Sequence, residues 1–173
     1  MRPNLSPYHT IALRRITLRP VSVSDRDFLL THWGDPLVRR FLFDATPAVP
    51  VHIAEAIPNS AHDFAALGYG LWIIHHALRG KRLGTVGLRR LEDIGIEVFY
   101  SLAPAAWGHG YATEAARGVV DHALGPLGLA EVFAEVDEDN TASAAVIEQL
   151  GMTAFAVVPG VFGSVIRYRK TRA

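Results

Sequence analysis

Along this chain, short runs of alternating apolar and polar residues are followed by segments whose apolar residues recur every three to four positions. The first alternating run covers 16–20 and predicts a strand. Helical spacing follows over 24–33, where Ser24 stands as a candidate N-cap. A second helical pattern covers 52–67, and Pro58 is expected to break or kink that helix.

The middle of the chain is rich in β-forming residues. Strands over 69–77 and 83–88 flank a turn that contains Gly80, so they are expected to form a hairpin. A third strand over 94–102 has largely apolar residues on both faces, which indicates a central position in a sheet. One face carries Ile94, Ile96, Val98 and Tyr100, and the other carries Glu97, Phe99 and Ser101.

The last third predicts two further helices and three further strands. One helix begins after a glycine turn and stops at Gly125, and the other is capped by Asn140 and ended by Gly151. The strands are expected over 131–136, 152–158 and 164–170. The order of elements predicts an α/β chain with about seven strands in its sheet.

Length and composition limit the class of protein. A chain of 173 residues is long enough for one domain, so a single domain over 1–173 is expected, with 1–13 as a candidate N-terminal tail. Half of the residues are apolar, which supplies a core. The sequence contains neither a secretory h-region nor an apolar stretch long enough to span a bilayer, so we expect a cytoplasmic protein without a membrane partner.

Charge and cysteine content exclude several kinds of chemistry. Seventeen basic residues balance seventeen acidic ones, so a nucleic-acid partner is not expected. The absence of cysteine excludes disulfides, thiolate zinc sites and cysteine nucleophiles. His75 and His76 are neighbours on a predicted strand and point to opposite faces, so no shared metal site is expected.

Gly108 and Gly110 lie between a predicted buried strand and a predicted helix. Such a turn brings backbone N–H groups and the positive end of a helix dipole together, which suits a phosphate or pyrophosphate. A Walker A loop would need Gly-Lys-Ser/Thr, and a Rossmann turn would need a glycine where Thr113 stands. By itself the turn also fits a plain strand-to-helix connection, so its context decides.

That context is the run PAAWGHGYATEA, followed further along by NTASAAVIEQLGM. Together they resemble the GNAT superfamily of acyl-CoA-dependent N-acetyltransferases, in particular its Rim-type branch, which acetylates N-terminal amines of ribosomal proteins among other substrates. ITLRP, GTVGLRRL and IEVFYSL resemble the first, third and fourth strands of that family, so the resemblance covers 16–170. It implies a mixed, mostly antiparallel sheet flanked by helices and splayed between strands 4 and 5, with the pantetheine arm of acetyl-CoA in the gap.

The same resemblance implies a coenzyme site and no metal. Backbone N–H groups of the pyrophosphate loop would hold the diphosphate, and the loop consists of Trp107, Gly108, His109, Gly110, Tyr111 and Ala112. Backbone groups of the fourth strand would pair with the pantetheine amides, and these belong to Phe99, Tyr100, Ser101 and Leu102. An N–H near Val98 or Phe99 would polarise the thioester carbonyl. The Asn140 side chain would contact the coenzyme as well as cap its helix.

Two residues are candidates for catalysis. Ser143 would hydrogen-bond the departing sulfur and relay a proton through water. Many superfamily members place a tyrosine acid four residues beyond that serine, and this chain has Ile147 there. Glu97 is the candidate base, and its apolar neighbours would raise its pKa; a substrate-orienting or cross-strand charge is the alternative. Glu114 is expected to stabilise the helix N-terminus.

The predicted function is transfer of the acetyl group of acetyl-CoA to a primary amine, a peptide N-terminus or a small molecule, by direct attack in a ternary complex. The alternative is an acyl-CoA-binding sensor or interaction module with little turnover, which Ile147 favours. The acceptor stays open, and so does a homodimer, since many relatives pair. Core is preferred over pocket wall for four aromatic residues, Trp33, Trp72, Phe41 and Phe43.

Overall fold

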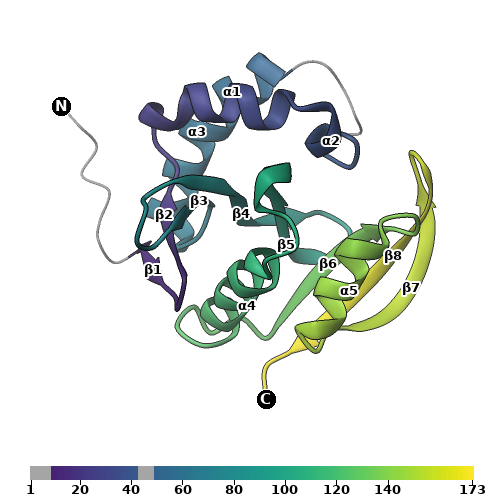
Figure 1. Cartoon of the computed structure of the whole chain (residues 1–173). Helices are drawn as coiled ribbons and strands as arrows, with labels where there is room; N and C mark the ends of the chain where they lie inside the picture. Colours follow the sequence, from purple (N-terminus) through teal and green to yellow (C-terminus); the bar gives the residue numbers. More distant parts are fainter. Residues whose placement is uncertain (1–8, 43–48) are drawn as a thin grey trace.

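The computed structural model describes residues 9–42 and 49–173. Its eight strands form one sheet in the order β1-β2-β3-β4-β5-β6-β8-β7 (Figure 1). Neighbouring strands are antiparallel except β5 and β6, which are parallel. The strands are β1 (Ile11–Ala12), β2 (Ile16–Pro20), β3 (Leu71–His76), β4 (Arg82–Leu91), β5 (Gly95–Leu102), β6 (Glu131–Asp137), β7 (Thr153–Gly160) and β8 (Gly163–Thr171).

Helices cover both faces of this sheet. They are α1 (Arg26–Gly34), α2 (Pro36–Arg39), α3 (Val49–Leu67), α4 (Tyr111–Leu124) and α5 (Thr141–Gln149), with short 3-10 turns η2 (Val23–Asp25) and η4 (Pro104–Ala106). In Figure 1, α1 and α3 lie on one side of the sheet, and α4 and α5 lie on the other. The mixed, mostly antiparallel sheet with flanking helices confirms the predicted fold class.

Each face of the sheet has its own apolar core, and β5 contributes to both. Ile96 and Val98 belong to the larger core, which α4 and α5 cover. Phe99 packs against the smaller core, which includes Leu29 of α1 and Ile53 of α3. The alternation along β5 confirms the prediction of a central strand with two largely apolar faces.

The sheet splays between β5 and β6. The β4–β5 ladder continues from Gly84 opposite Leu102 to Leu91 opposite Gly95. In contrast, β5 and β6 pair at one register position, Glu97 opposite Phe133. Beyond Glu97, the backbone of β5 therefore has an open edge toward β6. The extra strand β1 precedes the predicted ones, so this is the predicted splay between strands 4 and 5.

Two local predictions at the N-terminal end are wrong. Residues 11 and 12 form β1 instead of lying in a tail, because Ile11 pairs with Leu18 and the Leu13 N–H donates to the Ile16 carbonyl at 2.9 Å. Ser24 does not cap α1, because η2 precedes that helix. There Asp25 accepts a hydrogen bond from the Ser22 N–H at 2.9 Å.

Pro58 does not break its helix. α3 runs through it from Val49 to Leu67. Proline removes one N–H, which frees the carbonyl four residues earlier, here that of Ala54. Pro58 and Ala54 are both exposed, so water can satisfy the freed carbonyl.

Candidate active site

A turn with two left-handed glycines connects β5 to α4. The φ angles are 79° at Gly108 and 78° at Gly110, values that favour glycine over every residue with a side chain. Before the turn, the Trp107 indole N–H donates to the Leu102 carbonyl at 2.9 Å, which ties the turn to the end of β5. Within the described part of the chain, the N–H groups of Gly108, His109 and Gly110 have no acceptor. With the N-terminus of α4, they suit the predicted diphosphate.

Arg15, in the turn just before β2, contacts the glycine turn from outside. Its Nη1 donates to the His109 carbonyl at 2.6 Å, and its Nε lies 2.7 Å from Glu114 Oε2. Its backbone N–H donates to the other Glu114 oxygen at 2.7 Å, and the guanidinium lies 4.8 Å from the centre of the Tyr111 ring. Glu114 therefore joins α4 to the β1–β2 turn, beyond its expected place in the first helical turn.

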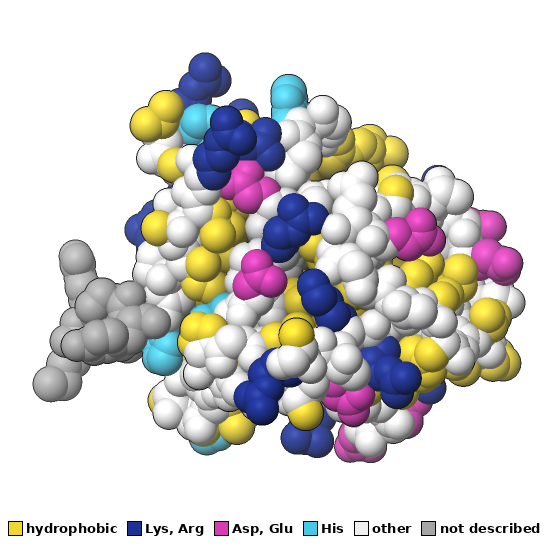
Figure 2. Space-filling view, turned by 90° about the horizontal axis from the view of Figure 1, so that it is seen from below, with side chains coloured by type: hydrophobic (Ala, Val, Ile, Leu, Met, Phe, Trp, Pro, Cys, Tyr) yellow, Lys and Arg dark blue, Asp and Glu magenta, His cyan; other side chains and the backbone are white. Residues whose placement is uncertain are grey.

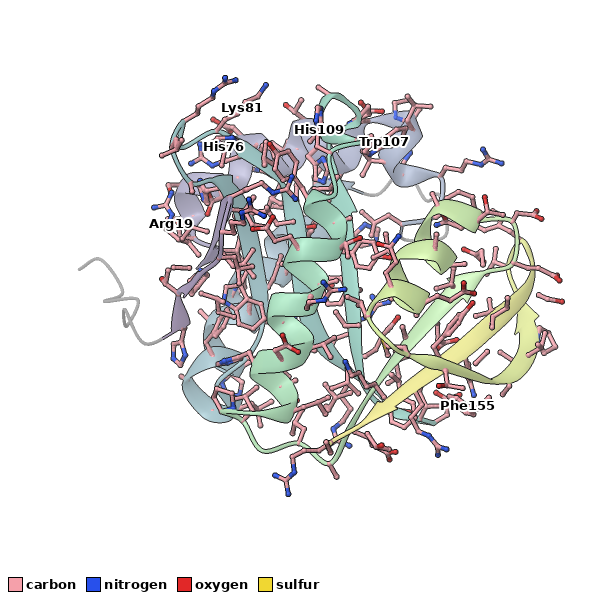
Figure 3. All side chains as sticks on the ribbon, turned by 60° about the horizontal axis from the view of Figure 1, so that its bottom comes forward. Arg19, His76, Lys81, Trp107, His109 and Phe155 are labelled. Carbon is pink, nitrogen blue, oxygen red and sulfur yellow. The ribbon has the colours of Figure 1, made fainter. Side chains whose placement is uncertain are left out.

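Further polar groups lie near the same end of the molecule. The His76 ring centre is 6.1 Å from that of Tyr111, and the His109 ring centre is 5.6 Å from it. Figure 3 shows His76, Lys81, His109 and Trp107 along one edge. On the face seen in Figure 2, basic and acidic side chains are interspersed.

Asn140 and Ser143 lie where α5 begins, across the splay from β5. Asn140 Oδ1 accepts a hydrogen bond from the Ser143 N–H at 3.2 Å, which confirms the N-cap. The Ser143 Oγ lies 2.7 Å from the Tyr100 hydroxyl oxygen. Desolvation raises the pKa of Tyr100 to about 12, although its hydrogen bond to Ser143 acts in the opposite direction. Ile147 is buried in the larger core.

Glu97 lies on the opposite face of β5 from Tyr100. It is 3% exposed, and its Oε2 lies 2.9 Å from Arg89 Nε. The Arg89 guanidinium covers the Phe99 ring at 4.8 Å from the ring centre. Burial raises the pKa of Glu97, and this effect outweighs the attraction of Arg89, which lowers it. The two candidate catalytic residues, Glu97 and Ser143, thus lie on different sides of one strand.

A hydrogen-bonded row that the sequence did not reveal lies on the Glu97 face. The Ser101 hydroxyl is 2.8 Å from His32 Nε2 and 2.8 Å from Thr85 Oγ1. His32 is 4% exposed and stacks on Phe28 at 5.2 Å between ring centres. Burial lowers the pKa of His32 to about 4, so its ring is neutral near neutral pH.

The four aromatic residues and the histidine pair of the sequence analysis lie at separate places. Trp33 and Trp72 lie in the core as preferred, and Phe41 is half-buried. Phe43 lies outside the described residues. His75 is buried beside Arg19, and His76 lies near Tyr111.

Over 9–42 and 49–173, no cluster of three or more metal-binding side chains is found, and none of the helices combines the length and hydropathy needed to cross a bilayer.

Residues 15–153 match the family model described as the acetyltransferase (GNAT) domain. The chain belongs to the GNAT family of acetyltransferases. As a member of this family, it is an acyl-CoA-dependent acetyltransferase, and acetyl-CoA is the acyl donor that the family uses.

Individual relatives agree with this membership. The chain is 28% identical to the uncharacterized N-acetyltransferase p20 of Bacillus licheniformis, over 82% of this GNAT chain and 80% of the relative. It is 28% identical to the FsC-acetyl coenzyme A-N(2)-transacetylase of Aspergillus fumigatus, over 94% and 76%. The crystal structure of the ribosomal-protein-S5-alanine acetyltransferase of Vibrio fischeri has the same fold, with a TM-score of 0.80 at 16% identity over 94% and 96%.

Proposed function

We propose that this GNAT protein transfers the acetyl group of acetyl-CoA to a primary amine by direct attack in a ternary complex. The observation that carries the proposal is the open edge of β5. This edge ends near the turn before α4, whose N–H groups at 108–110 have no acceptor among the described residues, and an adjoining face of β5 carries the buried Glu97 carboxylate. One strand can therefore receive the coenzyme along its edge and the amine from its Glu97 face.

The coenzyme side uses mainly backbone groups. The amides of the turn, with the dipole of α4 behind them, would bind the diphosphate. The open edge of β5 from Phe99 to Leu102 would pair with the amides of the pantetheine arm as a further strand does. An N–H of β5 near Val98 or Phe99 would then hydrogen-bond the carbonyl oxygen of the thioester.

The acceptor side supplies the base. The amine must lose its proton to attack, and an ionised Glu97 takes that proton directly or through water. The amine nitrogen bonds to the carbonyl carbon, the carbon–sulfur bond breaks with its electron pair on sulfur, and the nitrogen releases its second proton to water to give the amide. Ser143 donates a hydrogen bond to the departing sulfur, and water delivers the proton that makes the free thiol.

The acceptor class follows from pKa values and from the Rim-type resemblance. A peptide N-terminus has an ordinary pKa of about 7.7 to 8.0 against about 10.4 for lysine, so more of it is neutral at neutral pH. We therefore propose a peptide N-terminus or a small-molecule amine as the acceptor. The enzyme is proposed to act in the cytoplasm as a single domain, without a metal, nucleic acid or membrane.

A thiol-release assay with a panel of amines tests this function. Purified protein is mixed with acetyl-CoA and either N-terminal peptides, small amines or no acceptor. We expect free thiol above background hydrolysis with at least one amine, together with the acetylated amine by mass spectrometry. Binding of acetyl-CoA by calorimetry without thiol release would instead support the acyl-CoA sensor, which Ile147 favours.

A further inference from the structure

Tyr100 places a phenol at the leaving-group side of the site. Ile147 occupies the position where many superfamily members carry a tyrosine acid, and it is 1% exposed in the larger core. The Tyr100 hydroxyl reaches Ser143 from β5 instead, 2.7 Å from its Oγ and 3.2 Å from its backbone carbonyl oxygen. Tyr100 lies in the part of β5 beyond Glu97, where β5 no longer pairs with β6.

We propose that Tyr100 is a positioning residue for the Ser143 hydroxyl. In the free protein the single Tyr100 proton goes to the Ser143 carbonyl oxygen, and Tyr100 accepts from Ser143 Oγ. When the sulfur departs, the Tyr100 proton turns to Ser143 Oγ, and the Ser143 proton is directed toward the sulfur. This inference rests on the proposed function. A serine hydroxyl has one proton and two lone pairs. When Tyr100 fills one lone pair, the serine proton is left for another acceptor. Within the described residues, Ser143 Oγ has no other hydrogen-bond partner.

The backbone of Ser143 is fixed independently of Tyr100. Asn140 Oδ1 accepts from the Ser143 N–H at 3.2 Å, which sets the first turn of α5. With the backbone fixed, the Ser143 side chain and its hydroxyl proton can still rotate. The contact with Tyr100 restricts that rotation, because the phenol is anchored in the sheet next to the open edge of β5.

Tyr100 is not itself the acid. Its pKa of about 12 lies well above the roughly 8.5 of an ordinary thiol, so a thiolate would not take its proton. Tyr100 and Ser143 therefore end the reaction protonated as they began. The electron pair of the broken carbon–sulfur bond stays on sulfur, and water supplies the proton.

A double-mutant cycle tests the proposal. Y100F, S143A and the double variant are assayed by thiol release with acetyl-CoA and the best amine of the panel. We expect each single variant to lower kcat about five- to tenfold, as loss of one neutral hydrogen bond would, and to leave KM for acetyl-CoA within about twofold. Since both changes remove one coupled unit, the double variant should be no slower than S143A alone.

Matched controls separate this role from a structural one. Tyr168 is buried in the same core at 3% exposure, so Y168F should leave kcat unchanged, and melting temperatures are compared for all variants. If Y100F folds poorly, S143A alone must still show the loss of kcat with unchanged KM. Additive losses in the double variant, or an unchanged kcat in S143A, overturn the inference while the acetyltransferase function stands. Lack of thiol release by the wild-type protein overturns both.

Discussion

Acidification should destabilise this protein through His32. Burial lowers the pKa of His32 from 6.5 to about 4. As the pH falls from 6.5 toward 4, the unfolded chain takes up a proton at this position and the folded chain does not. The free energy of unfolding therefore falls over that window and is level again below it. A shift of this size corresponds to about 3 kcal/mol.

The H32Q variant isolates this contribution. Glutamine does not titrate, and its side-chain amide can form a hydrogen bond with Ser101 as donor or acceptor. Urea unfolding followed by circular dichroism, from about pH 7 to about pH 4, gives the free energy of unfolding of both proteins. The wild-type protein should lose about 3 kcal/mol more than H32Q across the window. His75 and His122, whose pKa values burial also lowers, titrate in both proteins and cancel in the difference. Parallel curves for the two proteins would refute the reasoning.

Three further changes test the site. Gly110→Val places a side chain at a φ of 78° beside Arg15 Nη2, so acetyl-CoA binding by calorimetry should disappear; unaltered affinity would remove the assignment of the pyrophosphate loop. For Glu97→Gln, the rise of rate with pH that ionisation of this raised-pKa carboxyl produces should vanish or move, whereas an unchanged profile would assign the base to another group. Arg15→Met should raise KM for acetyl-CoA about tenfold and leave KM for acetyl-pantetheine, which lacks the diphosphate, unchanged; equal effects on the two donors would show that Arg15 does not act through the loop.

Features of the site that depend on neighbours in sequence were predictable. Gly108 and Gly110 are needed by the local backbone, and the Asn140 side chain reaches an N–H only three residues away. The two-sided pattern of β5 was visible because its apolar residues serve two cores. In each case the residue and its structural role lie within one element, so the pattern carries the information.

Features that depend on distant contacts were not predictable. Arg15 and Glu114 are 99 positions apart, and neither has a local pattern that points to the other. In the sequence, His32 has the pattern of an ordinary polar residue of an amphipathic helix. Its contact with Ser101 arises only when α1 packs on β5. The continuation of α3 through Pro58 was not predictable either. It depends on the exposure of the Ala54 carbonyl to water, which replaces the hydrogen bond that proline cannot donate.

The alternation of side chains along β5 places two sets of residues on opposite faces of the strand, so each set can be changed separately. In the proposed function, residues of β5 that point to α1 and α3 face the amine, while those that point to α5, and the backbone edge itself, face the acyl donor. Substitutions on the first face are therefore expected to change the choice of amine without changing the binding of the donor. For protein engineers, positions 99 and 101 are accordingly the ones to randomise when a different amine is wanted, with Glu97 kept as the proposed base.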